Sequence, residues 1–324
     1  MKATARAHPI EGLVKYHGMR DDELRLPYHD SISLCTAPSN TTTTVEFDGS
    51  LDSDLYVIDG EEVTGRAAER VRHVVDHVRT LADTDERLRL ESENSFPTNV
   101  GFGSSASGFA AAAMALTEAA GLDLTLSEIS TIARRGSASA ARAVTGGFSH
   151  LRAGLNDEDC YSEAVPAPAE FRENIRVIGA LVPSYKETEH AHEEAAQSHM
   201  FDARTAHVRG QIAKMRDALR EGSFHRVFEL AEHDTLSLAA TTMTGPSGWV
   251  YWQPETIEIF NTVRELRSEE DVPVYFSADT GASVYVNTTE EYVDRVEAVA
   301  ACGVETRRWN VGGPAHLLDD ESLF

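Results

Sequence analysis

Basic residues are scarce in this chain of 324 residues, which has 29 lysines and arginines against 53 aspartates and glutamates. The formal net charge is -24, and only four of the basic residues are lysine. So negative a chain excludes general charge attraction to nucleic acid or to an anionic membrane, because both need clustered cations. The acids occur as short pairs, such as Asp21-Asp22 and Glu269-Glu270. This spread favours a halophilic surface screened by concentrated salt over a single acidic patch.

Cysteines and long apolar runs are also few. Cys35, Cys160 and Cys302 are widely spaced and form no CxxC pair, which argues against a disulfide framework or a zinc site. The first 13 residues lack the apolar run of a signal peptide, and no segment approaches the ~18 apolar residues of a membrane span. We therefore expect a cytoplasmic protein with no nucleic-acid or membrane partner.

The pattern of strands and helices predicts an α+β fold without strict alternation. At about 150 residues per domain, the length fits two domains, which we place at 1–183 and 184–324. We expect Ser127 to cap a helix predicted at 125–135. In the first domain we expect strands at 31–36, 41–47, 88–93 and 174–182, and helices at 65–82, 106–120 and 125–135. In the second we expect helices at 187–199, 205–221, 224–240, 254–265 and 290–302, and strands at 272–277, 281–287 and 304–311.

A loop rich in glycine and serine at 95–109 is the most informative segment. Gly101 and Gly103 let a ligand approach the backbone closely, and the loop runs into a helix whose N-terminus suits phosphate. The loop lacks the GxxxxGK[ST] pattern of the common P-loop and the context of a dinucleotide fold. Composition alone leaves open a simple turn that caps a buried helix.

Four segments, in order, resemble the mevalonate diphosphate decarboxylases, members of the small-molecule kinase superfamily that includes galactokinase, homoserine kinase and mevalonate kinase. The segment PTNVGFGSSAS at 97–107 resembles their PxxxGLGSSAS phosphate loop. The other three are LVKYHGMRDDELRLP at 13–27, IARRGSASAARAVTGGF at 132–148 and YFSADTGASV at 275–284, which resemble IKYWGKRDxxLxLP, RxGSGSACRSxxGGF and TFDAGPNA.

The resemblance implies a fold and a reaction. The fold would be that of the superfamily, with an N-terminal domain like ribosomal S5 domain 2 and a ferredoxin-like C-terminal domain. The active site would lie in the cleft between them, often in a homodimer. The reaction would be ATP-dependent decarboxylation of a phosphorylated 3-hydroxy acid with Mg2+, in isoprenoid biosynthesis. Phosphorylation turns the poor 3-hydroxyl leaving group into a good one.

The same resemblance implies three catalytic residues. Asp279 would accept or orient the proton of the 3-hydroxyl group. Lys15 would keep Asp279 ionised or stabilise the transferring phosphoryl group, and Arg142 would pair with the substrate carboxylate. Each has a plainer alternative. Asp279 could be a turn residue before Gly281, Lys15 could lie on the surface at a strand edge, and Arg142 could form an ion pair on a helix surface.

Further residues match the substrate and ATP contacts of the family. The Arg70 side chain could equally lie on a helix surface, and the serines at 137 and 139 could form a helix-capping turn. The predicted substrate contacts are Tyr16, Arg70, Ser137, Ser139 and Arg142. The predicted ATP contacts are Pro97, Gly101, Gly103, Ser104, Ser105 and Ser107, with Ser104 and Ser105 also facing Mg2+.

Departures from the family pattern bear on the substrate. Met19 stands where the motif has a lysine associated with the terminal phosphate, and His29 stands where it has asparagine. The Ser-Ser-x-Gly-Met segment, another diphosphate contact, is not recognisable at 184–192. We therefore expect mevalonate 5-phosphate as substrate and isopentenyl phosphate as product, in a halophilic archaeal setting. The alternatives are a mevalonate 5-diphosphate decarboxylase, a 3-hydroxyl kinase that does not decarboxylate, and a non-catalytic binding module.

Overall fold

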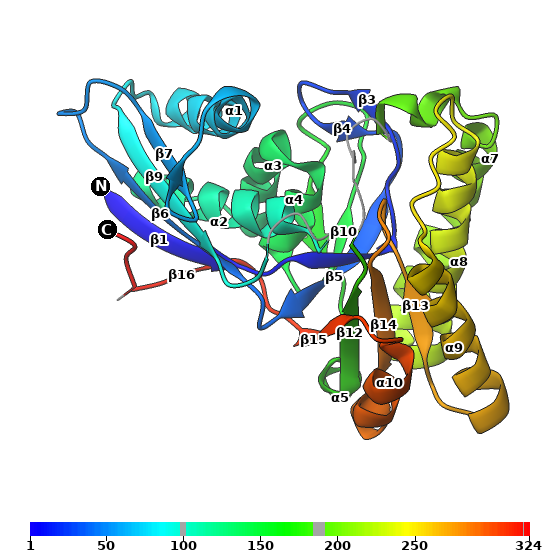
Figure 1. Cartoon of the computed structure of the whole chain (residues 1–324). Coiled ribbons are helices and arrows are strands. Elements are labelled where there is room, and N and C mark those ends of the chain that lie inside the picture. Colours follow the sequence, from blue (N-terminus) through cyan, green and yellow to red (C-terminus); the bar gives the residue numbers. More distant parts are fainter. Residues whose placement is uncertain (98–101, 184–191, 320) are drawn as a thin grey trace.

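The computed structural model describes residues 1–97, 102–183, 192–319 and 321–324. Two large sheets dominate it, and helices pack against each of them (Figure 1). Among the described residues, β7 and β9 form the one parallel strand pair. Antiparallel sheets covered by helices are typical of an α+β fold, which agrees with the prediction from the sequence.

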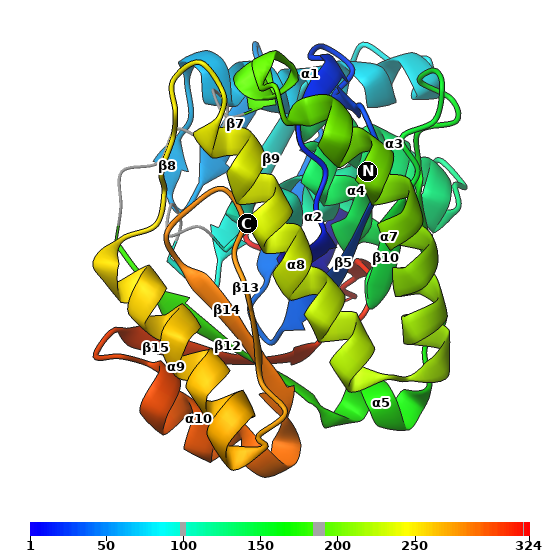
Figure 2. The ribbon, with the colours of Figure 1, turned by 90° about the vertical axis from the view of Figure 1, so that its right-hand side faces the viewer.

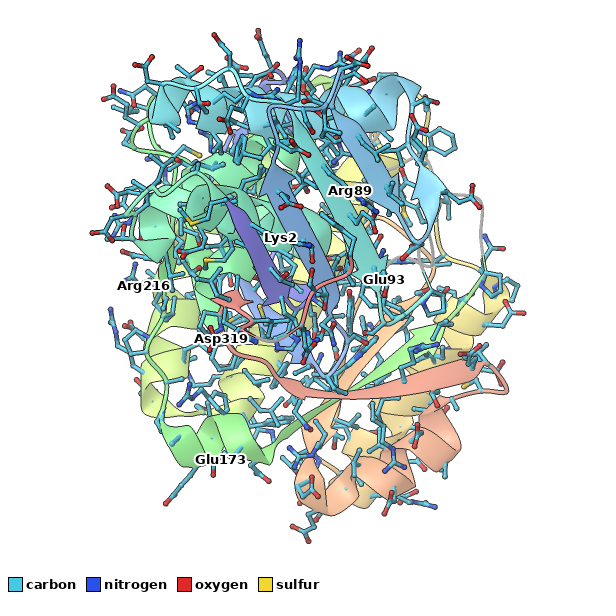
Figure 3. The ribbon with its side chains drawn as sticks, turned by 90° about the vertical axis from the view of Figure 1, so that its left-hand side faces the viewer. Lys2, Arg89, Glu93, Glu173, Arg216 and Asp319 are labelled. Carbon is cyan, nitrogen blue, oxygen red and sulfur yellow. The ribbon has the colours of Figure 1, made fainter. Side chains whose placement is uncertain are left out.

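The first sheet has six strands in the order β16-β1-β6-β9-β7-β8. Its centre is β6, whose run of β-branched residues pairs with β1 on one side and β9 on the other. Charged side chains such as Lys2, Arg89 and Glu93 stand on the outer face (Figure 3). The strands are β1 (Lys2–Ala7), β6 (Thr41–Phe47), β7 (Leu55–Ile58), β8 (Glu61–Glu62), β9 (Leu88–Asn94) and β16 (His316–Leu317).

Four helices lie on the inner side of this sheet, where α2 packs on the strands and the other three pack on α2 (Figure 1). Helical spacing predicts an apolar stripe of Val71, Val74, Val75, Val78 and Leu81; the four valines are buried against the core, but the prediction is wrong for Leu81, which is 47% exposed near the end of the helix. The alanine-rich second helix packs directly on β1 and β6, because its small side chains allow a close approach. The helices are α1 (Gly65–Ala82), α2 (Ser104–Ala119), α3 (Leu126–Gly136) and α4 (Ala138–Thr145).

The prediction that Ser127 caps α3 is wrong. The N-cap is Thr125, whose hydroxyl accepts from the Glu128 backbone N–H while the Glu128 side chain accepts from the Thr125 N–H. This reciprocal pair is a capping box. The Ser127 hydroxyl instead donates to the Ser162 carbonyl, which ties the helix to a neighbouring strand.

The second sheet has eight strands in the order β11-β10-β5-β15-β12-β14-β13, and β2 pairs with β5 beside this path. It joins distant parts of the sequence, since β5 pairs with β15 near the C-terminus. Two further short strands, β3 (Met19–Asp21) and β4 (Leu26–Pro27), form a separate ribbon. The strands are β2 (Ile10–Val14), β5 (Ser31–Ala37), β10 (Phe148–Leu151), β11 (Ser162–Ala164), β12 (Ile175–Leu181), β13 (Tyr275–Ser277), β14 (Val284–Thr289) and β15 (Glu305–Val311).

Helices of the second half pack on this sheet (Figure 2). Helix α8 contacts both β2 and β13, which places it beside strands far apart in the sequence. Residues 187–191 of the helix predicted at 187–199 lie outside the described residues, and within the described remainder 195–197 form the 3-10 turn η1 (Ala195–Gln197). The helices are α5 (Ala169–Asn174), α7 (Phe201–Glu221), α8 (Phe224–Met243), α9 (Pro254–Glu270) and α10 (Val293–Ala300), the last preceded by the 3-10 turn η2 (Glu290–Tyr292).

Several predicted boundaries shift by a few residues. The strand predicted at 272–277 begins only at Tyr275, two residues after Pro273, which has no N–H to donate to a ladder. The strand predicted at 281–287 begins at Val284, after the turn that follows Asp279. No helix of the described residues is long and apolar enough to cross a membrane.

The division at 183/184 stays a prediction. Strand β12, which ends just before it, pairs with β14 and β15 on its two sides. Strand β16 returns to pair with β1 of the first sheet. The chain therefore crosses more than once between the parts that the sequence assigns to separate domains.

Candidate active site

Strand β2 brings Lys15 into the interior at the point where the strand ends. The residue is 4% exposed, and its Nζ donates to Thr235 Oγ1 at 3.2 Å and to Ser277 Oγ at 3.0 Å. Its backbone N–H donates to Asp234 Oδ2 at 2.8 Å. These partners come from α8 and β13, so the ammonium group is fixed where three elements meet. The alternative of a surface lysine at a strand edge is wrong.

Asp279 lies two residues after β13 and converges with Lys15 on the backbone of β2. A methyl group on Gly12 would lie 2.7 Å from Lys15 Cγ and 3.0 Å from Asp279 Oδ1. Glycine at this position therefore leaves the room in which the two side chains approach one another. The Gly281 N–H donates to the Asp279 carbonyl at 3.0 Å, so this residue also belongs to a turn. Asp279 can therefore be a turn residue and a catalytic candidate at the same time.

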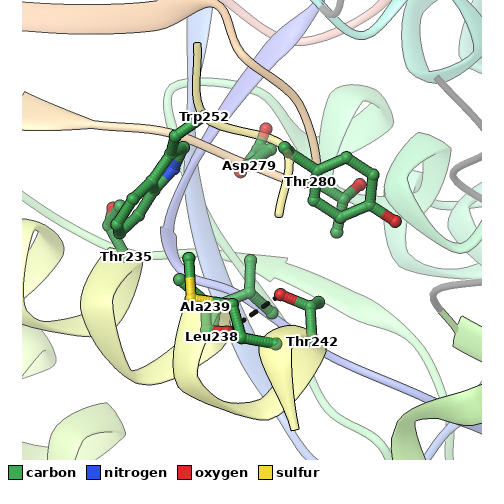
Figure 4. Close-up of a pocket in the computed structure, with 9 residues that line it drawn as sticks. Thr235, Leu238, Ala239, Thr242, Trp252, Asp279 and Thr280 are labelled. Atoms are coloured by element: carbon green, nitrogen blue, oxygen red, sulfur yellow. Dashed lines mark hydrogen bonds between the residues drawn. The ribbon is translucent and has the colours of Figure 1, made fainter. Parts of the chain in front are cut away.

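A recess opens beside Asp279 and Thr280 (Figure 4). Its wall comes from the C-terminal half of α8 and from the aromatic residues after it, and most of that wall is apolar. An apolar wall keeps water away from a reacting carboxylate and strengthens electrostatic interactions there. The lining residues are Thr235, Leu238, Ala239, Thr242, Met243, Tyr251, Trp252, Asp279 and Thr280.

A buried ion pair between Arg204 and Asp234 fixes the backbone of Lys15. Arg204 Nη2 donates to the Lys15 carbonyl at 2.7 Å and to Asp234 Oδ2 at 3.3 Å. The side chains of Arg204 and Asp234 are 1% and 0% exposed. Since Asp234 also receives the Lys15 N–H, the pair fixes the backbone from which the ammonium group extends. A buried, hydrogen-bonded ion pair of this kind holds geometry more than it adds stability.

Arg142 projects from α4 and is 3% exposed. In the described part of the chain, its Nε and Nη1 are buried without a hydrogen-bond partner. Burial lowers its pKa, and the charges of Tyr16 and Asp279 oppose that effect. Its guanidinium carbon lies 5.3 Å from the centroid of the Tyr16 ring. A buried fork with unused N–H groups is suited to a carboxylate, and an ion pair on a helix surface is not what the structure contains.

The other predicted substrate contacts gather around the start of α4. Tyr16 Oη lies 3.1 Å from Ser139 Oγ. Ser137 is the N-cap of α4 and is 8% exposed, but among the described residues its hydroxyl makes no capping hydrogen bond. Arg70 reaches across from α1, where its Nε and Nη2 donate to the Gly136 carbonyl at 3.1 and 2.7 Å. These contacts place Arg70 beside the Gly136–Ser137 peptide, so four of the predicted substrate contacts lie around the N-terminus of α4.

The N-terminus of α2 carries most of the predicted ATP contacts. Gly103 is its N-cap in a left-handed conformation, at φ 72°. The described residues give this end no side-chain cap, so the first turn at Ser104 and Ser105 keeps N–H groups available for an anion. The Ser107 hydroxyl differs, because it is buried and bonded to Thr41 Oγ1 at 2.7 Å. Pro97 is exposed, and Gly101 lies outside the described residues.

Met19 pairs with Pro27 in the β3–β4 ribbon and is half-buried. The guanidinium of the next residue, Arg20, donates to the carbonyls of Pro27 and Ala153. His192 reaches this region from a distant part of the chain, where its ring stacks on Tyr16 with centroids 5.0 Å apart and its Nδ1 accepts from the Gly18 N–H at 3.3 Å. Gly18 also faces Ala195 and Phe201 closely. No lysine or arginine stands at position 19 to neutralise a phosphate.

Comparison with known proteins gives this geometry a family. A model of the diphosphomevalonate decarboxylase-like N-terminal domain matches residues 7–162. Phosphomevalonate decarboxylase of Haloferax volcanii is 72% identical over 326 residues, which covers 100% of both chains. The chain belongs to the diphosphomevalonate decarboxylase family. The diphosphomevalonate decarboxylase of Candida albicans is 30% identical over 86% of this chain and 82% of its own.

Solved structures of the diphosphomevalonate decarboxylase family show the same fold. The Staphylococcus aureus enzyme matches with a TM-score of 0.93 and 26% identity, over 98% of each chain. A complex described as MDDEF with MVAPP, AMPPCP and magnesium matches with a TM-score of 0.92 and 28% identity, over 98% of this chain and 99% of that one. These matches confirm a mixed two-domain fold of helices and sheets for this chain.

Several side chains of this family site escaped the sequence reasoning. Asp234, Thr235 and Arg204 support Lys15 from helices more than 180 residues further along the chain, and no local motif marks them. Glu11 lies four residues before Lys15 and is completely buried. A glutamate inside the apolar run of a strand was the one available signal, because a charged side chain is rarely buried without a reason.

Proposed function

We propose that this chain catalyses the ATP-dependent decarboxylation of mevalonate 5-phosphate to isopentenyl phosphate, CO2, ADP and phosphate. The observation that carries the proposal is the buried guanidinium of Arg142, whose unused N–H groups lie near the Lys15–Asp279 pair. The 72% identical relative is named a phosphomevalonate decarboxylase, and a solved relative binds MVAPP, AMPPCP and magnesium. Both support the proposal.

In this mechanism Arg142 binds the substrate carboxylate and sets the orientation of the carbon chain. Asp279 accepts the proton of the 3-hydroxyl group while the hydroxyl oxygen forms a bond to the γ-phosphorus of ATP, and ADP leaves. The ammonium of Lys15 lies beside that centre and stabilises the negative charge on the transferring group. The bond from C3 to the phosphorylated oxygen then breaks and its electron pair leaves with phosphate. The bond from C2 to the carboxylate carbon breaks as well; its electron pair forms the double bond between C2 and C3, and the carboxylate leaves as CO2.

The N-terminus of α2 fits the phosphates of ATP. Its uncapped first turn offers N–H groups and the hydroxyls of Ser104 and Ser105. Mg2+ would be held there by these hydroxyls together with the phosphates, whose charge it neutralises. The described residues contain no cluster of three or more histidine, cysteine or carboxylate side chains able to hold a metal, which fits an ion that arrives with the nucleotide.

Met19 supports the choice of the monophosphate. A charge-assisted hydrogen bond to a phosphate is worth about 1.5–3 kcal/mol, and a methionine thioether cannot make one. The stacked pair of Tyr16 and His192 lies beside this corner. A halophilic archaeal origin, a cytoplasmic location and a homodimer belong to the same proposal, and the 72% identity to the Haloferax protein supports the first of them.

Release of CO2 and ADP from the same reaction tests the proposed chemistry. Equal amounts of the two products are expected, whereas ADP without CO2 would indicate a kinase that stops at the 3-phosphate. Asp279→Asn should lower kcat by about 10²–10⁴-fold, the usual contribution of a general base. The control is Asp271→Asn, because Asp271 ends α9 at φ 56°, a conformation that asparagine also tolerates. Undiminished turnover in Asp279→Asn would contradict the mechanism.

A further inference from the structure

Glu11 is a buried acid inside the active site that the proposed mechanism does not use. It lies on β2, four residues before Lys15, and is 0% exposed. Its Oε1 accepts a hydrogen bond from Asn287 Nδ2 at 2.8 Å, and Asn287 on β14 is also completely buried. An ionised carboxylate with so little compensation is costly in the interior.

The surrounding hydrogen bonds fit a protonated carboxyl group. Within the described residues, Glu11 Oε2 and Asn287 Oδ1 are both buried and accept no hydrogen bond. An ionised glutamate can only accept hydrogen bonds, so with Glu11 ionised neither Glu11 Oε2 nor Asn287 Oδ1 has a donor. A proton on Glu11 provides the missing donor. Burial raises the pKa of Glu11 to about 8; the Asn287 amide, the Lys15 ammonium and the Ser277 hydroxyl oppose the rise, and the charge of Asp279 adds to it.

Glu11 is coupled to the reacting groups through its neighbours. Ser277 Oγ accepts from Lys15 Nζ at 3.0 Å and donates to the carbonyl of Gly12 at 3.2 Å, the residue next to Glu11. The Tyr285 hydroxyl donates to the carbonyl of Ile10, on its other side. Burial raises the pKa of this phenol, and the charges of Asp279 and Glu11 add to the effect.

Charged groups also come from the helices packed against β2. These are Arg142 of α4, Arg204 of α7, and Glu232 and Asp234 of α8. Arg204 pairs with Asp234, and Glu232 pairs with Arg267. The two α8 carboxylates therefore have cations of their own, which leaves Lys15 and Asp279 as the charged groups that act on Glu11.

We propose that Glu11 is a positioning residue of this active site, which works with its carboxyl group protonated and fails when that group ionises. In the protonated form Lys15 is left to serve Asp279 and the transferring phosphoryl group. Ionisation adds a second carboxylate that competes for the same ammonium and repels the anionic substrates. The inference rests on the proposed function for its effect on turnover, but the protonation state is independent of it.

The pH profile of Glu11→Gln tests the effect on turnover, because glutamine keeps the acceptor for Asn287 and carries a permanent donor. For the wild type, kcat/KM should fall about tenfold between pH 7 and pH 9 as a group with a pKa near 8 ionises. Glu11→Gln should keep kcat/KM at pH 7 within about threefold and lose less than about half of it by pH 9. The matched control is Glu93→Gln on the outer face of the first sheet (Figure 3), which should keep the wild-type profile.

Two results would overturn the proposal. One is an alkaline fall in Glu11→Gln as steep as in the wild type. The other is loss of activity at every pH in a folded Glu11→Gln, which would make Glu11 a catalytic carboxylate. If that variant does not fold, Asn287→Leu serves instead. It removes the hydrogen bond that favours the ionised form, so the alkaline fall should move to higher pH, and an unchanged profile would count against the proposal.

Carbon-13 NMR of glutamate side chains measures the protonation directly, in the enzyme without substrate. The carboxyl signal that is absent from Glu11→Gln should titrate near pH 8. Titration near the ordinary value of about 4.3 would overturn the proposal. Because no turnover is needed, a normal titration would refute the role of Glu11 even in an active enzyme. An inactive enzyme with a signal near pH 8 would instead refute the proposed function alone.

Discussion

Replacement of Arg142 by methionine should stabilise the protein and abolish its activity at the same time. The side chain is buried, and within the described residues two of its nitrogens have no hydrogen-bond partner. Each unsatisfied buried donor costs about 1–3 kcal/mol, and methionine fills a similar volume without that cost. The variant loses the interaction with the Tyr16 ring, worth about 1–2 kcal/mol. Two such donors together outweigh the ring interaction, so we expect the free energy of unfolding to rise by up to about 5 kcal/mol.

The loss of activity follows from the same nitrogens. Two charge-assisted hydrogen bonds to the substrate carboxylate are worth about 3–6 kcal/mol together, so kcat/KM should fall by about 10²–10⁴-fold. Arg142→Lys keeps the charge but not the planar fork, and should recover only part of this loss. The assay is CO2 release at varied substrate concentration, combined with denaturant unfolding of the same preparations.

Arg204→Met is the matched control, because this buried arginine has partners. It donates to Ser237 Oγ and to the Lys15 carbonyl, and it pairs with Asp234. Removing one member of a buried ion pair typically costs about 3–5 kcal/mol, so this variant should be destabilised. The reasoning is refuted if Arg142→Met loses as much stability as Arg204→Met, or if it retains wild-type activity.

Three further outcomes follow from particular contacts. Thr125→Ala removes the capping box of α3 and should lower the free energy of unfolding by about 1 kcal/mol, measured by denaturant titration; Thr131→Ala on the same helix, outside the cap, should cost less. Burial lowers the pKa of His29 to about 4, against 6.5 for an exposed histidine, so the unfolded chain binds more protons between these values. Stability should therefore rise with pH from about 4 to 6.5, by about 3 kcal/mol at most, and His29→Asn should flatten this dependence in unfolding experiments. Ala239→Leu fills the recess beside Asp279 and should lower kcat/KM while leaving the free energy of unfolding within about 0.5 kcal/mol; wild-type kinetics would show that substrate does not use the recess.

Local patterns predicted the elements that a single stretch of sequence determines. The valine stripe of α1 and the alanine-rich α2 follow from helical periodicity and from burial of small side chains. The short helix α4 was not predicted as an element, because it has only eight residues and half of them are alanine, so little in the sequence separates it from the helix before it. The pairing of β5 with β15 joins segments more than 270 residues apart and has no local signal.

The residues of the site also differ in whether a local sequence pattern marks them. Lys15, Arg142 and Asp279 lie in segments with recognisable motifs, and the structure brings them to one centre. Asp234 and Arg204 act through Lys15 alone, so only the packing of α7 and α8 reveals them. Ser107 lies within a motif, yet its hydroxyl is bonded to Thr41 inside the protein. A motif identified the segment but did not distinguish a hydroxyl that faces a ligand from one that faces the core.

The substrate preference tests the central claim most directly. The measurement is kcat/KM for mevalonate 5-phosphate and for mevalonate 5-diphosphate on the wild-type enzyme in concentrated salt, with Met19→Lys alongside. The absence of a cation at Met19 predicts at least a tenfold preference for the monophosphate, equivalent to about 1.4 kcal/mol. Met19→Lys should narrow that preference. A wild-type enzyme that turns over the diphosphate more efficiently than the monophosphate would contradict the account.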